Sequence, residues 1–127
     1  MAVTFRYIVH DVDAAIPFYV DTLGFSLLMH PAPGFAALAK GDLRLLLNRP
    51  GAGGAGQSMP DGQSPSPGGW NRIQIEVEDL AATVARMKEE GGRFRSEIIS
   101  GNGGKQIIIE DPSGNPIELF EPARREG

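Results

Sequence analysis

The chain has 127 residues, a mass of 13.6 kDa and, with 12 basic against 16 acidic side chains, a formal net charge of −4. This length suits one domain with one substantial core, and the scattered basic residues disfavour nucleic acid as a partner. The lack of cysteine excludes disulfides, thiolate metal sites and cysteine nucleophiles. We expect a cytoplasmic protein, because no segment approaches the roughly 18 apolar residues of a membrane span and no signal-peptide pattern is present.

The first half of the chain predicts a strand, a helix and three further strands. Apolar residues alternate over residues 3–9 (Val3, Phe5, Tyr7 and Val9), which is typical of a strand with one buried face. Asp11 or Asp13 can cap a helix that ends near Gly24, and Pro17 is expected within about its first turn, where a missing N–H costs least. Strands are predicted at about 25–30, 35–40 and 43–48, between clusters of turn-forming residues.

Residues 50–69 separate the two halves. This segment is too rich in Gly, Pro and Ser to pack as a helix or strand, so it predicts a flexible linker. A loop that closes over a ligand is the alternative, and the sequence leaves both open.

The second half repeats the pattern. Alternating Ile73, Ile75 and Val77 predict a strand, Asp79 a helix cap, and Gly91-Gly92 the helix end. Strands follow at about 93–98, 105–110 and 115–120. The glycine run at 101–104 favours a hairpin loop over a phosphate loop, because it lacks the Lys-Ser or Lys-Thr ending on a helix.

An internal repeat relates these halves. A shift of 68 residues places Val9 on Val77, Asp11 on Asp79 and Gly24 on Gly92. Self-similarity of this kind indicates duplicated architecture. We therefore predict an α+β fold of two βαβββ modules, at about 3–49 and 70–122, joined by the linker at about 50–69.

Four stretches carry a family resemblance: VHDVDAAIPFYVDTLGFSLL from Val9, GDLRLLL from Gly41, VEDLAATVARMKEEGGRF from Val77 and DPSGNPIELFEP from Asp111. Over residues 3–122 the chain resembles the vicinal-oxygen-chelate superfamily of glyoxalases, bleomycin-resistance proteins and dioxygenases. The resemblance implies one domain whose two sheets curl around a cleft, with the helices outside and the site often completed in a homodimer.

The resemblance also implies where a metal would bind. Metal-using members place His or Glu on the first and last strand of each module, and the matching positions here are Thr4, Leu45 or Leu46, Arg72 and Glu118. A divalent metal wants about three oxygen or imidazole ligands, and a permanent cation such as Arg72 repels it. We therefore expect no metal and no cofactor. For His10 and His30, solvated or capping roles are favoured over metal binding or acid–base work.

The strand alternation predicts a polar floor for the cleft. If Val3 and its alternate neighbours face the helices, then Thr4 and Arg6 face the cleft, as do Arg72 and Gln74 beside Glu118. We expect Arg72 to pair with Glu118 in place of a metal, either as a structural ion pair or as part of a ligand site. Trp70 at the cleft rim can stack on a planar ligand or simply anchor a loop. The expected ligand-binding set is Thr4, Arg6, Leu46, Trp70, Arg72, Gln74, Glu118 and Phe120.

Three functions fit this site. The leading one is a metal-free protein that binds a small molecule in the cleft. The alternative is a lyase or dioxygenase-like enzyme of the superfamily, with Glu118 as acid, base or metal ligand; Glu118 is then the candidate catalytic residue. The third is an interaction domain whose cleft is filled by its own side chains.

Overall fold

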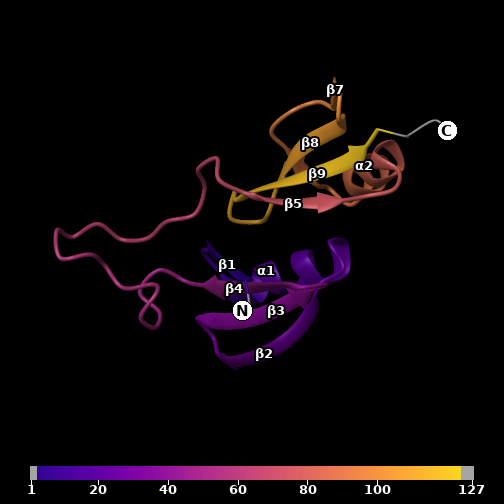
Figure 1. Ribbon diagram of the computed structural model, residues 1–127. Helices are drawn as coiled ribbons and strands as arrows, with labels where there is room; N and C mark the ends of the chain where they lie inside the picture. Colours follow the sequence, from indigo (N-terminus) through magenta and orange to yellow (C-terminus); the bar gives the residue numbers. More distant parts are fainter. Residues whose placement is uncertain (1–2, 124–127) are drawn as a thin grey trace. The chain divides into compact units, whose positions relative to one another are not determined.

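The computed structural model describes residues 3–123, and these divide into two compact units. The first comprises the described residues up to Gly68 together with Pro112–Asn115, and the second comprises the remainder (Figure 1). Each unit holds one mixed sheet and one helical region, so the chain has the predicted α+β fold. The order is β-α-β-β-β in the first half, whereas in the second half the first strand after the helix is divided into two short strands. Within residues 3–123, no helix is long and apolar enough to cross a membrane.

The first unit contains β1 (Val3–Ile8), α1 (Val12–Pro17), η1 (Phe18–Thr22), β2 (Ser26–Ala32), β3 (Phe35–Lys40) and β4 (Leu43–Asn48). Its sheet has the order β1-β4-β3-β2, in which only β1 and β4 run parallel. Tyr7 is buried and its ring lies 6.1 Å from that of Tyr19 in η1, which identifies the helical face of the sheet. Val3, predicted on the same face, is instead 69% exposed at the start of β1.

The first helix departs from the prediction at Pro17. Asp11, rather than Asp13, caps α1, accepting a hydrogen bond from the Ala14 N–H at 3.3 Å. Pro17 lies at the last position of α1, not in its first turn. Because proline has no N–H to donate, the chain changes there to the π-helical η1, which ends as Leu23 N–H donates to the Phe18 carbonyl at 3.2 Å.

The second unit contains β5 (Ile73–Glu76), α2 (Leu80–Glu89), β6 (Arg93–Phe94), β7 (Ile99–Gly101), β8 (Gly104–Glu110) and β9 (Pro116–Pro122). Its sheet has the order β5-β9-β8-β6, with β7 also pairing with β8 and β5 parallel to β9. The side chains buried on the α2 side are Leu80, Val84, Met87, Ile107, Ile109, Ile117 and Leu119. These residues form the core of the unit.

Helix α2 has a defined signal at each end. The Asp79 carboxylate accepts from the Ala82 N–H at 3.0 Å, as predicted for the cap. At the other end Gly91 has a φ of +81°, and the N–H groups of Gly91 and Gly92 bond the carbonyls of Lys88 and Met87. This Schellman arrangement is the reason a glycine is required there.

The strand predicted at 93–98 is wrong. Within this segment the chain is paired as a strand only at β6 and β7. The Arg95 N–H still donates to the Ile108 carbonyl at 2.8 Å, and residues 96–98 bow out before β7. The Ile108 N–H, which would bond a backbone carbonyl in a regular ladder, donates to Ser96 Oγ at 3.2 Å. A side chain that can accept a hydrogen bond thus allows the strand to break.

Residues 49–72 contain no helix or strand, as their composition predicts. Local turns organise the segment, with the Gly56 N–H bonded to the Ala52 carbonyl at 3.0 Å and the Gly62 N–H to the Met59 carbonyl at 2.8 Å. Asn115, in the β8–β9 turn, fixes the end of this segment to the first unit. It accepts from the Gly68 N–H at 2.8 Å and donates to the Ile8 carbonyl at 2.7 Å.

Candidate functional site

A cluster of polar side chains lies on the face of the second sheet opposite to α2. Glu118 in β9 stands between the core residues Ile117 and Leu119, so its side chain points to the other face. The parallel register places Gln74 of β5 directly beside Glu118. Arg72, just before β5, reaches the same carboxylate. The alternation predicted from the sequence therefore brings these three residues together.

Both oxygens of the Glu118 carboxylate accept hydrogen bonds from neighbouring side chains. Arg72 donates to Oε1 from Nε at 3.0 Å and from Nη2 at 2.7 Å, and Gln74 Nε2 donates to Oε2 at 2.6 Å. The side chains of Arg72 and Glu118 are 26% and 10% exposed. The guanidinium charge thus compensates the carboxylate in a partly desolvated place, where an unpaired charge would be costly.

The first unit presents a matching but apolar position. Arg6 of β1 lies opposite Leu46 of β4, just as Gln74 lies opposite Glu118. This register identifies Leu46, rather than Leu45, as the counterpart of Glu118, since Leu45 is fully buried. Arg6 Nη1 donates to Oδ1 of Asn48, which lies two residues along β4 and is 3% exposed.

The predicted site residues are divided between the two units. Thr4, Arg6 and Leu46 belong to the first. Trp70, Arg72, Gln74, Glu118 and Phe120 belong to the second. Thr4 is exposed and lies opposite Arg44 in the register of β1 with β4. Phe120 is half-buried on the same face as Glu118. Each set lies in or next to one sheet, and a cleft formed by both sets remains a prediction.

An aromatic–cation stack adjoins the Glu118 cluster. Trp70 is 68% exposed, and the guanidinium carbon of Arg95 lies 4.7 Å from its ring centroid. Arg95 is held in turn by Glu110, at 2.8 Å between Nε and Oε2, and it donates to the Gly69 carbonyl. The Trp70 carbonyl accepts from Arg72 Nη1 at 3.1 Å, which links the stack to the cluster.

Arg95 and Glu110 were not predicted as site residues. The two residues are 15 positions apart in the chain, and the alternation within a single strand does not reveal that they pair. The strands predicted at about 93–98 and 105–110, taken as an antiparallel pair, are the one signal in the sequence that could have suggested this contact.

The residues at the family's metal positions do not fit a metal ion. Thr4 and Leu46 lie in the first sheet, and Glu118, the only carboxylate among the four, already accepts from Arg72. Within residues 3–123, no group of three or more His, Asp or Glu side chains is arranged to hold an ion. His30 Nε2 lies 3.3 Å from Asp13 instead, and the backbone N–H of His10 donates to Ser113 Oγ at 2.8 Å.

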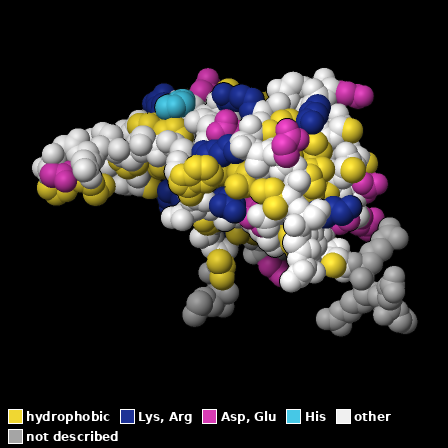
Figure 2. Space-filling view, turned by 90° about the horizontal axis from the view of Figure 1, so that it is seen from above, with side chains coloured by type: hydrophobic (Ala, Val, Ile, Leu, Met, Phe, Trp, Pro, Cys, Tyr) yellow, Lys and Arg dark blue, Asp and Glu magenta, His cyan; other side chains and the backbone are white. Residues whose placement is uncertain are grey.

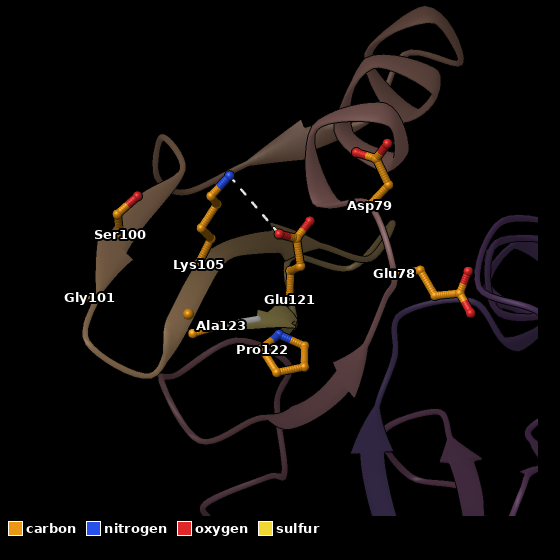
Figure 3. Close-up of a pocket in the computed structure, with 9 residues that line it drawn as sticks. Glu78, Asp79, Ser100, Gly101, Lys105, Glu121, Pro122 and Ala123 are labelled. Atoms are coloured by element: carbon orange, nitrogen blue, oxygen red, sulfur yellow. Dashed lines mark ion pairs between the residues drawn. The ribbon is translucent and has the colours of Figure 1, made fainter. Parts of the chain in front are cut away.

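A pocket of about 470 Å³ lies at the start of α2, away from the Glu118 cluster (Figure 3). Three of its polar side chains, those of Asp79, Lys105 and Glu121, already have structural partners. Glu121 accepts from the Leu80 N–H at 2.8 Å and lies 4.0 Å from Lys105, while Asp79 is the helix cap. We assign these carboxylates to stabilising the helix N-terminus.

Charged side chains of both signs are interspersed on the face shown in Figure 2. Basic side chains on that face alternate with acidic and apolar ones. Such a surface lacks the continuous basic stripe typical of nucleic-acid binding.

Comparisons with known proteins agree with this architecture. A sequence profile of the Glyoxalase/Bleomycin resistance protein/Dioxygenase superfamily matches residues 2–119. TnmS3, an antibiotic binding protein from a Streptomyces species, is 29% identical with a TM-score of 0.72, covering 97% of this chain and 96% of its own. A superfamily member from Sphaerobacter thermophilus is 24% identical with a TM-score of 0.75, covering 95% and 96%.

A probable lactoylglutathione lyase from Arabidopsis thaliana is 42% identical over 55 residues. That match covers 42% of this chain but only 16% of the plant protein. With a profile match over nearly the whole length and the same fold in solved structures, the chain belongs to the Glyoxalase/Bleomycin resistance protein/Dioxygenase superfamily.

Proposed function

We propose that the chain is a metal-free protein that binds a small organic molecule, with the Glu118 cluster and Trp70 as its main contacts. The observation that carries this proposal is the pairing of Arg72 with Glu118 at the family's metal positions. The likeness to an antibiotic binding protein along nearly the whole of both chains supports it. The proposal includes a cytoplasmic homodimer in which Thr4, Arg6 and Leu46 complete the site.

The donors and acceptors of the cluster favour a largely uncharged ligand. The charges of Arg72 and Glu118 compensate each other, so neither is left to pair with a charged ligand. Arg72 retains N–H groups beyond those used on Glu118 and Trp70, and Gln74 retains its carbonyl oxygen. Beside them, Trp70 and Phe120 offer apolar ring surface. A planar molecule with carbonyl or hydroxyl groups matches this combination.

The second candidate is an enzyme that uses Glu118 as acid or base. The segment shared with the probable lactoylglutathione lyase favours it. The two hydrogen bonds from Arg72 to Oε1 of Glu118 argue against a metal-assisted mechanism, because the guanidinium occupies this oxygen and its positive charge would repel a metal ion. Turnover of hemithioacetal substrates by the purified protein, with no added metal, would favour the enzyme over the binding protein.

Binding can be measured through Trp70, the single tryptophan of the chain. We expect bleomycin or another member of a panel of aromatic antibiotics to raise the melting temperature and to change the Trp70 fluorescence in a saturable way. At 100 times the Kd, such a ligand adds about 2.7 kcal/mol to the free energy of unfolding.

Replacing Arg72 is the specific test of the site. For a ligand found in this way, Arg72→Leu should weaken binding by about ten-fold or more, as expected for losing a charge-assisted hydrogen bond. Arg86→Leu, on the exposed side of α2, is the matched control and should bind as wild type. Unchanged affinity in a folded Arg72→Leu variant would remove Arg72 from the site.

A further inference from the structure

A separate pocket of about 340 Å³ lies in the second unit, between α2 and residues 94–98. Its floor is formed by Val84 and Ile107, which are 5% and 2% exposed. Phe94 and Ile98 form apolar walls, and the remaining lining residues are polar or charged. Ile107 faces α2, whereas its neighbour Ile108 pairs with Glu118 on the other face. The pocket is therefore distinct from the Glu118 cluster.

The pocket arises from a strand irregularity. Continuing the β6 register, in which Arg93 faces Glu110, would place Ile99 opposite Gly104, but Ile99 lies opposite Gln106. Two extra residues are thus inserted at one place, and Ser96 Oγ accepts the Ile108 N–H there. Insertions of this kind are frequent beside functional sites.

The first unit contains an insertion of the same size, but its extra residues are distributed differently along the strand. In β2 the register also shifts by two residues in total, but in two separate steps, between Leu27 and Met29 and between Met29 and Ala32. As a result β2 remains one strand of seven residues. The concentrated insertion, and with it the bowed segment over the floor residues Val84 and Ile107, is particular to the second unit.

Two opposite charges stand on the rim of this pocket. Lys88 and Glu97 are both exposed lining residues, and Lys88 Nζ lies 5.8 Å from the centroid of the Phe94 ring. A ligand with one charge would be attracted by one of them and repelled by the other. A zwitterion with an apolar side chain can pair with both and cover the apolar floor.

We propose that this pocket binds a free α-amino acid with an apolar side chain. Its carboxylate pairs with Lys88, its ammonium group pairs with Glu97, and its side chain lies on Val84 and Ile107. The Ser96 hydroxyl, which accepts from Ile108, keeps its own proton to donate to the ligand carboxylate. A volume near the lower limit of ligand pockets suits a molecule of this size.

Methyl NMR of the full chain tests the proposal with L-phenylalanine as the probe. Saturable shifts are expected for the methyl groups of Val84, Ile98 and Ile107. Two analogues with a single charge, 3-phenylpropanoate and 2-phenylethylamine, should each bind about ten-fold more weakly because one charge-assisted contact is lost. Shifts absent at millimolar phenylalanine, or equal affinity for 3-phenylpropanoate, would overturn the proposal.

Charge-removing variants identify the contacts. Lys88→Gln and Glu97→Gln should each weaken phenylalanine binding by about ten-fold, and both change exposed residues, so the fold should survive. The matched controls are Arg86→Gln and Glu89→Gln, which lie on α2 outside the pocket lining and should leave the affinity unchanged. Wild-type affinity in Lys88→Gln, or an equal loss in Arg86→Gln, would contradict the assignment.

Discussion

Arg72→Leu is expected to lower the free energy of unfolding by roughly 2–3 kcal/mol, because it leaves the Glu118 carboxylate poorly solvated and without its principal partner. This loss is smaller than the loss of about 3–5 kcal/mol that is typical when a fully buried pair is broken, because the Arg72 side chain is 26% exposed. Gln74 retains its bond to Oε2, which further limits the loss. Urea or guanidinium denaturation of the purified variants measures the change.

The double variant Arg72→Leu/Glu118→Leu should recover most of that loss. Replacing both members of a partly buried pair by apolar residues is often nearly neutral, so we expect stability within about 1 kcal/mol of wild type. The coupling energy from this double-mutant cycle separates the interaction between the two side chains from the effect that each residue has alone. If the loss of stability in the double variant equals the sum of the losses in the two single variants, the ion pair contributes no stability of its own.

Leu119→Ala is expected to have the largest effect on the fold, lowering the free energy of unfolding by about 2–5 kcal/mol. Leu119 is fully buried in β9 on the α2 side, next to Glu118 on the opposite side. Truncating it leaves a cavity in the second core while the polar face is untouched.

The matched control for this change is Leu28→Ala. Leu28 is 53% exposed in β2, so the same truncation should cost less than about 0.5 kcal/mol. Denaturant midpoints of the two variants give the comparison. A similar small loss for both would mean that the faces of β9 have been assigned the wrong way round.

The local features of the fold were predictable because they depend on neighbouring residues. Asp79 and the glycines after α2 act within one helical turn, so the cap and the helix end could be read from the sequence. Alternation placed Glu118 on the polar face, and the strand ranges of β3 and β4 follow from their apolar runs and turns.

What the sequence did not reveal depends on register. The choice between Leu45 and Leu46 needs the pairing of β1 with β4, which composition does not fix. The break between β6 and β7 depends on Ser96 accepting a hydrogen bond from the Ile108 N–H, and the Trp70–Arg95 stack depends on contacts between distant segments.

The position of Pro17 was predicted wrongly for a different reason. The local rule favours proline in the first turn of a helix, whereas here Pro17 ends α1 and a π-helical segment follows it.

The most direct test of the central claim is the metal content and metal affinity of the purified chain. Elemental analysis after exposure to Ni²⁺, Zn²⁺, Mn²⁺ and Fe²⁺, followed by gel filtration, should find only traces of metal, because Arg72 and Gln74 already donate to the two Glu118 oxygens and the Arg72 charge repels a cation. One tightly bound ion per chain, lost in Glu118→Gln, would contradict the account.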